Sequence, residues 1–397
     1  MSIDRSPEKE ENACPRWRGS KRWGVKATGY FALSALSGWC LWCEHARGET
    51  FWLSCLLVAA VIAGIFYALS RIGGRCDTLY FATQDCERAQ RLRDEIERGQ
   101  RYGRLVARCA TTCLDRDGQR LAAGILPPVG RFQSEILACS GVTPTRDQIQ
   151  AMTPPRWLAG HFTWLAQQLG PALNALPPSM PCYLVMQCDS GLPVEEEQQL
   201  LLQTGAPFNR HFTPLSASGL LALDDWLDDT ARAPSALVVI AVQRAVPPED
   251  ALEEKGALPG AEGIIESTVG LVMISEYCPS LPVLARIHRP QPEPASACSR
   301  ALSRALLWAR LEPKAVRHAW LTGNGAVAAA TEQALRLAPQ TLIHHLDDVL
   351  GPAGMATPWL SLAAAAEQCR EDGAAQLIIC HEAARRIWIG GVTPPEP

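Results

Sequence analysis

Two apolar runs near the N-terminus are the most prominent hydrophobic feature of the chain. The longer run, residues 51–69 (FWLSCLLVAAVIAGIFYAL), has no charged residue and as a helix would cross the roughly 30 Å apolar core of a bilayer. The shorter run, residues 27–43, precedes it across the polar link 44–50. The pair predicts a helical hairpin that crosses a membrane and returns. A buried core helix is the alternative for either run.

Beyond residue 156 the pattern changes to short apolar runs that alternate with amphipathic segments. Helices are predicted at 157–169, 194–203, 218–231, 300–311, 326–337 and 359–372. Strands are predicted at 182–187, 236–242, 268–275, 283–288, 316–321, 376–380 and 385–389. This alternation predicts an α/β domain of two comparable halves with helix-covered sheets, divided by Pro- and Gly-containing loops at 246–263 and 289–297.

The region between the hairpin and this domain is harder to interpret. A mixed-charge stretch, CERAQRLRDEIERGQRYGR, carries Ala89, Leu92 and Ile96 at helical spacing, which predicts a solvated linker helix beside the membrane. Residues 105–142 contain Gly and Pro and are expected to be irregular, with an early strand. The predicted plan is a disordered cytoplasmic tail 1–26, a transmembrane hairpin 27–70, a juxtamembrane region 71–142 and a domain 143–397.

The flanks of the apolar runs predict the orientation of the hairpin. Lys and Arg collect at cytoplasmic ends of membrane helices, and the link 44–50 has Arg47 alone between two glutamates. Both termini are therefore predicted to be cytoplasmic, in a multi-pass protein of the inner membrane. A cleaved signal peptide is the competing interpretation of residues 27–43. The basic flanking residues are Arg16, Arg18, Lys21, Arg22, Lys26, Arg71 and Arg75.

Composition limits the classes of ligand. The net charge of −4 at pH 7 gives no reason to expect a nucleic-acid partner. The 15 cysteines are odd in number and scattered, and a cytoplasmic domain keeps thiols reduced. The pairs Cys109/Cys113 and Cys182/Cys188 lack a second pair that would complete a zinc site. We therefore expect structural thiols, no metal and no cofactor.

Three segments resemble signature segments of the β-ketoacyl synthases, a thiolase-like family. Residues 301–326 resemble the stretch that ends in the family's HGTGT loop, which reads TGNGA here, and residues 349–366 (VLGPAGMATPWLSLAAAA) resemble its GHxxGAAG loop and small-residue helix. Residues 213–223, TPLSASGLLAL, resemble the nucleophile segment DTACSSSLVAL. The segments keep the family's order, and the resemblance covers residues 156–394. It implies a thiolase-like fold, a pair of α/β halves with buried sheets.

The positions that match the family's catalytic residues carry other residues here. In the family a Cys thiolate takes up the acyl group and basic residues assist it. The resemblance places the nucleophile at Ser216, the first His at Thr322, the Lys at Asp347 and the second His at Pro352. None of these supplies an imidazole or an ammonium group, so the resemblance predicts a degenerate site and no enzyme. The loop glycines are kept: Gly323, Gly325, Gly351 and Gly354.

Other chemical patterns are incomplete. Ser218 has no Gly two residues before it, so a G-x-S-x-G elbow is missing. The histidines of the domain lack triad or metal spacing and are interpreted as surface or satisfied core residues. They are His161, His211, His288, His318, His344, His345 and His381. An acidic patch is interpreted as a solvated face, with a basic partner's surface as the alternative. It consists of Asp224, Asp225, Asp228 and Asp229.

The sequence therefore predicts a non-catalytic, membrane-anchored scaffold or adaptor at the cytoplasmic face of the inner membrane. Thiolase-like domains pair through the strand and helix near the nucleophile, so the resemblance implies a homodimer or a complex with a ketosynthase-like protein. One alternative is an accessory component of a membrane-linked secretion machine such as type VI secretion. The other is an acyltransferase or hydrolase that uses Ser216 or Ser218.

Overall fold

The structure is a computed structural model. It describes residues 49–112, 121–125, 153–204, 210–229, 234–244, 265–276, 278, 281–323, 331–333, 337–382 and 386–395. The chain divides into two compact units, Met1–Arg93 and Asp94–Pro397. The first predicted membrane helix, residues 27–43, lies outside the described residues.

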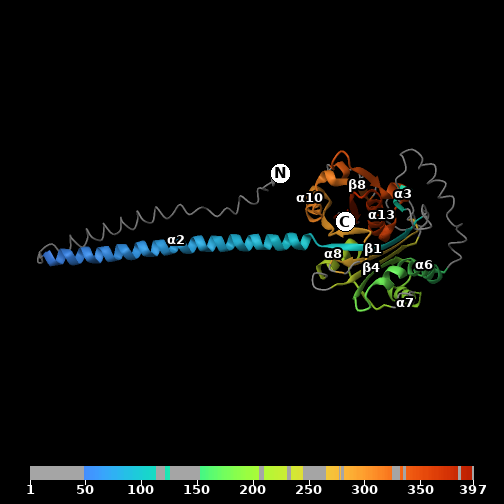
Figure 1. Cartoon of the computed structure of the whole chain (residues 1–397), viewed down its shortest axis with the longest axis horizontal. Coiled ribbons are helices and arrows are strands. Elements are labelled where there is room, and N and C mark those ends of the chain that lie inside the picture. Colours follow the sequence, from blue (N-terminus) through green and yellow to red (C-terminus); the bar gives the residue numbers. More distant parts are fainter. Residues whose placement is uncertain are drawn as a thin grey trace, which may run out of the picture. The chain divides into compact units, whose positions relative to one another are not determined.

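One long helix contains the second predicted membrane segment. Helix α2 runs without a break over Glu49–Gly99 (Figure 1), so residues 51–69 and most of the mixed-charge stretch belong to one helix. Large apolar side chains on it are exposed, among them Val61, Ile65, Ile72 and Leu79. Within the described part of the chain, no helix has the length and apolarity that crossing a membrane requires.

The described strands join into a single sheet. They are β1 (Tyr102–Thr111), β2 (Cys182–Asp189), β3 (Phe212–Pro214), β4 (Ala236–Gln243), β5 (Ser267–Ser275), β6 (Ala285–His288), β7 (Gln291–Pro294), β8 (Val316–Leu321), β9 (Leu342–His345), β10 (Ala375–Glu382) and β11 (Arg386–Thr393). Their order is β3-β2-β4-β5-β1-β6-β11-β10-β8-β9, and β7 pairs with β11. The seven predicted strands are confirmed, whereas β3, β7 and β9 were not predicted.

Helices follow most of the strands. They are α3 (Leu121–Ile125), α6 (Pro154–Ala175), α7 (Val194–Thr204), α8 (Gly219–Asp229), α10 (Cys298–Trp308), α12 (Leu346–Leu350) and α13 (Thr357–Asp372), with short 3-10 turns that include η6 (Gly354–Ala356). Five of the six predicted domain helices are confirmed. The sixth, residues 326–337, lies mainly outside the described residues.

The sheet consists of two halves with the same strand order. The first half reads β3-β2-β4-β5-β1 and the second reads β9-β8-β10-β11-β6. In each half the first three strands are parallel and the last two alternate in direction. Strands β1 and β6 pair antiparallel and join the halves. This topology confirms the predicted pair of α/β halves and the thiolase-like fold class.

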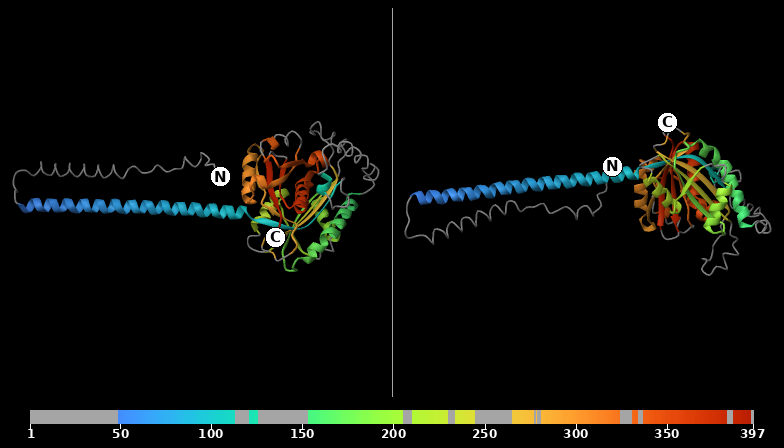
Figure 2. Two further views of the ribbon diagram at one scale, coloured as in Figure 1. Left: turned by 45° about the horizontal axis from the view of Figure 1, so that its top comes forward. Right: turned by 90° about the horizontal axis from the view of Figure 1, so that it is seen from below.

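Figure 2 shows five alternating layers: helices α6 and α7, the first half of the sheet, helices α8 and α13, the second half, and α10. Three clusters of buried apolar side chains fill the space between the layers. One lies between the first half and α6 and α7, one surrounds α8 and α13 between the halves, and one lies between the second half and α10. Successive side chains of a strand point to opposite faces. In β4, Leu237 and Val239 therefore join the central cluster, whereas Val238 and Ile240 join the cluster of α6.

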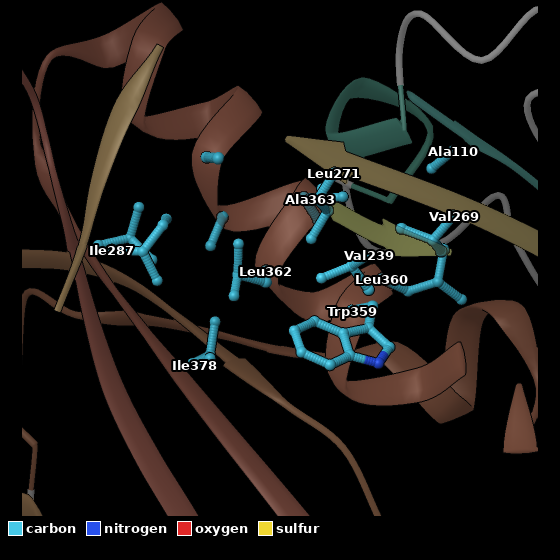
Figure 3. Packing of buried hydrophobic residues seen from close by; sticks show 14 of the residues in the cluster. Ala110, Val239, Val269, Leu271, Ile287, Trp359, Leu360, Leu362, Ala363 and Ile378 are labelled. Atoms are coloured by element: carbon cyan, nitrogen blue, oxygen red, sulfur yellow. The ribbon is translucent and has the colours of Figure 1, made fainter. Parts of the chain in front are cut away.

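Helix α13 forms much of the central layer. Its residues 359–369 are all buried. Figure 3 shows Leu362 of this helix between Ile287 of the second half and Leu271 of the first, with Trp359 beside Val239. The run of four alanines at 363–366 adds little side-chain volume, so both faces of the helix can approach a sheet closely. The small-residue helix predicted from the resemblance is thus the buried helix of the fold.

The largest difference from the sequence analysis concerns strand β1. The prediction assigned residues 71–142 to a juxtamembrane region and began the domain at residue 143. In the structure β1 lies in the middle of the sheet, paired antiparallel with β5 and β6. The compact unit that contains the sheet accordingly begins at Asp94.

Two arginines interrupt the apolar pattern of β1. Arg104 donates a hydrogen bond to the carbonyl oxygen of Cys278 at 2.8 Å. Arg108 forms a buried ion pair with Glu367 of α13, with 2.9 Å between Nη2 and Oε2. The same Glu367 oxygen accepts the backbone N–H of Ala122 at 3.1 Å, which connects α3 to α13. Because these partners are distant in sequence, hydrophobic periodicity could not reveal that both charges are satisfied inside the domain.

We expect Glu367→Gln to lower the free energy of unfolding by about 3–5 kcal/mol, because it leaves the charge of Arg108 buried without its ionised partner. Urea unfolding followed by circular dichroism measures this. The matched control is Glu293→Gln, which removes pairs with the exposed Arg300 and Arg304 and should cost about 1 kcal/mol or less. Equal losses in the two variants would contradict the importance of the buried pair.

Candidate functional site

The candidate site lies at the carboxyl ends of the parallel strands. In the second half, Thr322 and Gly323 directly follow β8, and α12 follows β9. The backbone N–H of Gly323 donates to Asp347 Oδ2 of α12 at 2.5 Å. Gly323 has a φ of 125°, a conformation that favours glycine. Asp347 and the loop after β8 therefore form one unit.

The segment after α12 connects this unit to the first half. The carbonyl oxygen of Pro352 accepts the N–H of Ile265 at 3.0 Å. The N–H of Met355, in η6, donates to Gln243 Oε1 at 3.1 Å, and Gln243 Nε2 donates to Asp189 Oδ2 at 2.6 Å. Gln243 and Asp189 are the last residues of β4 and β2. The carboxyl ends of the strands in both halves therefore lie along one connected segment, residues 347–355.

The four predicted site positions have different surroundings. Ser216 is exposed in the turn between β3 and α8, whereas Thr322 is buried at 1% exposure. Asp347 and Pro352 are half-buried. The structure brings Thr322 and Asp347 together around Gly323. It records no hydrogen bond between Ser216 Oγ and a described His, Asp or Glu.

The environment of Asp347 changes its acidity. Burial raises the pKa of its carboxyl to about 6, the N–H of Gly323 opposes this rise, and the charge of Asp348 supports it. A carboxyl group with such a pKa exchanges protons near neutral pH, which suits a general acid or base. The sequence analysis noted only that Asp347 supplies no ammonium group, and it did not anticipate this acidity.

His381, which the sequence analysis interpreted as a surface or satisfied core residue, lies beside the loop that follows β8. It lies on β10, which pairs in parallel with β8, so its ring packs against Gly323. A Cβ atom at Gly323 would lie 2.9 Å from His381 Cδ2. The Nε2 atom of His381 is 3.0 Å from Thr331 Oγ1. Burial lowers the pKa of His381, so the imidazole is mainly neutral at pH 7. The imidazole of His381 thus packs against Gly323, the residue that follows Thr322.

A signal for His381 existed in the sequence. The predicted strands 316–321 and 376–380 are neighbours in the structure, and the N–H of Thr322 donates to the carbonyl oxygen of Ile379 at 2.9 Å. A residue just beyond the second strand therefore lies beside the loop that follows the first. This pairing follows from the tertiary fold, so a search for local motifs did not find it.

Three other histidines have partners within the fold. His318 Nε2 is 3.2 Å from Asp372 Oδ2, and its Nδ1 is 2.8 Å from His344 Nε2. His288 Nε2 is 2.9 Å from Thr393 Oγ1. Burial lowers the pKa of His288 and His344 to about 4. These groups are neutral at pH 7 and have partners within the fold.

Cys380 precedes His381 but has the wrong acidity for a nucleophile. Complete burial raises the pKa of its thiol to about 12, and its neighbours Ser361 and Thr322 only partly oppose this. A thiol, unlike a thiolate, is a weak nucleophile. Among the described residues, no group of three or more His, Cys, Asp or Glu side chains could hold a metal ion. The candidate site thus includes the carboxyl group of Asp347 and the imidazole of His381.

The fold can be compared with solved structures. No protein-family model and no curated protein matches the chain. Similar structures include the ishigamide ketosynthase/chain length factor, at 15% identity and TM-score 0.49 over 74% of this chain and 100% of that one. Another is the peroxisomal 3-ketoacyl-CoA thiolase of Saccharomyces cerevisiae, at 12% identity and TM-score 0.48 over 74% of this chain and 98% of that one. A third is the acyltransferase ChlB3, at 11% identity and TM-score 0.48 over 75% of this chain and 98% of that one. At these identities the likeness concerns the fold, so a substrate has to be argued from the site residues.

The expectation that the chain is not an enzyme is contradicted by these comparisons. The similar structures carry the names of a ketosynthase, a thiolase and an acyltransferase, all of them enzymes. The expectation rested on the absence of a base at Thr322, Asp347 and Pro352. It overlooked His381, because the loop after β8 was considered without the strand beside it.

We expect Asp347→Asn to stabilise the protein at pH 8 by up to about 3 kcal/mol and to have no effect near pH 4. The folded chain holds the Asp347 proton up to a pKa of about 6, about two units above the ordinary value. Relative to low pH, the free energy of unfolding therefore falls as the pH rises from about 4 to 6, because the unfolded chain releases this proton first. The asparagine keeps an oxygen for the N–H of Gly323.

Thermal unfolding of both proteins at pH 4.5 and pH 8 measures the difference. Asp348→Asn, the exposed neighbour, is the control: it removes only a charge that supports the raised pKa, so it should stabilise the protein at pH 8 by less than Asp347→Asn and have little effect at pH 4.5. A less stable Asp347→Asn protein at pH 8 would contradict the raised pKa.

Proposed function

We propose that the chain is an enzyme of acyl transfer or acyl hydrolysis in which Ser216 receives the acyl group of a thioester or ester. The observation that carries the proposal is the ring of His381 against Gly323, beside the position that matches the family's first His. A serine hydroxyl needs a base to become a nucleophile. His381 supplies a group of that kind, neutral at pH 7 because burial lowers its pKa.

The surroundings of Ser216 support its role. It precedes α8, and the first N–H groups of a helix have no partners within the helix. Such N–H groups favour negative charge nearby, as on the oxygen of a tetrahedral intermediate. Leu215 and Ala217 on either side pack against the central cluster, while Ser216 itself is exposed. The turn is thus held in place with its hydroxyl accessible.

The proposed reaction has two steps. Ser216 Oγ attacks the carbonyl carbon and loses its proton to His381, and the thiol or alcohol leaves with a proton from His381 or Asp347. Water or a second acceptor then attacks the acyl-serine, which restores the hydroxyl. Asp347 suits the proton transfers because its pKa of about 6 lies near neutral pH. Because Ser216 belongs to the first half and His381 to the second, substrate would bind between their strand ends.

We further propose that the enzyme is a homodimer held at the inner membrane, with both termini in the cytoplasm. Strand β3 supports the first part, because it forms one edge of the described sheet, where the edge strand of a second copy would extend the sheet. The apolar run 51–69 and the basic residues that flank it support the second part.

We expect a fluorophosphonate or reactive acyl-thioester probe to label Ser216, as detected by peptide mass spectrometry. Ser216→Ala should abolish labelling, and His381→Ala should slow it by roughly 100-fold or more because the base is lost. The labelling rate should also fall at acidic pH, where His381 takes up a proton despite its lowered pKa. Matched controls are Ser218→Ala and His211→Ala, both at exposed positions near β3, which should label normally.

Melting curves establish that each variant remains folded. Labelling at Ser218, or a His381→Ala protein that reacts as fast as the unmodified chain, would overturn the assignment.

The membrane proposal is tested by washing membranes from cells that produce the full chain with alkaline carbonate. The protein should stay in the pellet. Replacing Val61 and Ile65 together by Asp should release most of it, because each carboxylate costs roughly 2.5–3.5 kcal/mol at the centre of a membrane helix. Leu92→Asp, equally exposed on α2 but outside the apolar run, is the control and should stay bound. Release of the unmodified chain would rule out the anchor.

A further inference from the structure

The last turn of α2 ends at a cluster of charged side chains, named here the Asp228 cluster. It consists of Arg98, Arg101, Asp224, Asp228 and Arg289. Arg98 binds both carboxylate oxygens of Asp228, with 2.9 Å between Nε and Oδ1. Arg289 Nη1 lies 2.6 Å from the same Oδ1, and Arg289 Nε lies 2.5 Å from Asp224 Oδ1. Arg101 Nη1 is 3.3 Å from the carbonyl oxygen of Asp228.

The cluster joins three parts of the unit Asp94–Pro397. Arg98 belongs to the last turn of α2, and the two aspartates lie on α8 of the first half. Arg289 directly follows β6 of the second half. Its Nη1 also donates to the carbonyl oxygen of Arg98 at 3.4 Å, at the helix end where carbonyl groups lack partners. One carboxylate therefore connects α2 to both halves.

A second set of contacts fixes the same helix end to α10. A methyl group at Gly99 would overlap the indole ring of Trp308, so α2 approaches α10 closely at this glycine. Gln100 Nε2 donates to the carbonyl oxygen of Leu307 at 3.3 Å. Arg310 Nε donates to Gln100 Oε1 at 3.0 Å. The end of α2 thus contacts α8 of the central layer and α10 of an outer layer.

The charges in the cluster are strongly coupled. Burial raises the pKa of Asp228, but hydrogen bonds from Arg98 and Arg289 outweigh this and hold the pKa well below its usual range. Arg289 is 7% exposed, so it depends on these carboxylates for compensation of its charge. Asp225 and Asp229 on the same helix are exposed. Half of the acidic patch that was interpreted as a solvated face is therefore an internal junction.

We propose that the Asp228 cluster couples α2 to α8, so that a displacement of the last turn of α2 is transmitted to the helix that Ser216 precedes. The carboxylate of Asp228 is the shared element, since it contacts Arg98 on one side and Arg289 on the other. This coupling is mechanical and does not require Ser216 to be catalytic. A partner or a membrane that acts on α2 would thereby alter the turn between β3 and α8.

Hydrogen exchange of the full chain, followed by mass spectrometry, tests the coupling. In Asp228→Asn the amides of residues 95–99 and of residues 223–227, which are bonded within their helices, should both exchange about tenfold faster, as expected for the loss of hydrogen bonds to a charged group. Amides of β4 should keep their rates. Asp225→Asn removes the same charge from the same helix but keeps the ion pairs of Asp224 and Asp228 with Arg98 and Arg289, and it should change no rate by more than about twofold.

Arg98→Gln provides a second, milder test, because Arg98 is 58% exposed and Arg289 still pairs with Asp228. Arg98→Gln should accelerate exchange at the end of α2 and in α8 by a smaller factor. If Asp228→Asn does not fold, this variant alone tests the coupling. Faster exchange in α2 with no change in α8, in either folded variant, would overturn the coupling. Equal acceleration in Asp225→Asn would overturn it as well.

Discussion

The burial of α13 between the two sheet halves is the constraint on which the rest of the domain depends. Residues 359–369 have no exposed face, so each half needs the other to cover its inner surface. The segment before α13 carries Asp347 and η6, and the strand after it carries His381. Placing this helix therefore also places the second half's contribution to the site. Apolar burial supplies the driving force, and it is not directional.

A few charged contacts within the apolar core orient the two halves of the sheet relative to each other. Arg108 of β1 meets Glu367 of α13, and Arg289 beyond β6 meets Asp224 and Asp228 of α8. Each connects the first half to the second. A buried ion pair gains its energy only in a narrow geometry, and it penalises other arrangements because a lone buried charge is costly. These pairs accordingly define how one half is oriented on the other.

Local pattern was enough to predict most of the elements and insufficient for the site. Periodicity predicted the helix from Trp359 and the strand at Ala236, because their apolar faces are continuous. It missed most of β1, whose Arg104 and Arg108 find partners only in the folded chain. The resemblance located Ser216 and Asp347. It could not reveal the acidity of Asp347 or the place of His381, since both arise from burial and from strand pairing.

The shared topology of the halves has a consequence for how such a site can diversify. Ser216 follows β3 by two residues, through Leu215, and Asp347 follows β9 by two residues, through Leu346. Both leucines pack against the central cluster, and β3 and β9 occupy the same place in their halves. The two side chains therefore occupy corresponding positions, or corners, in two halves that share one topology. In a symmetric pair of identical subunits those corners would have to carry the same residue, whereas a single chain can place a hydroxyl group at one and a carboxyl group at the other.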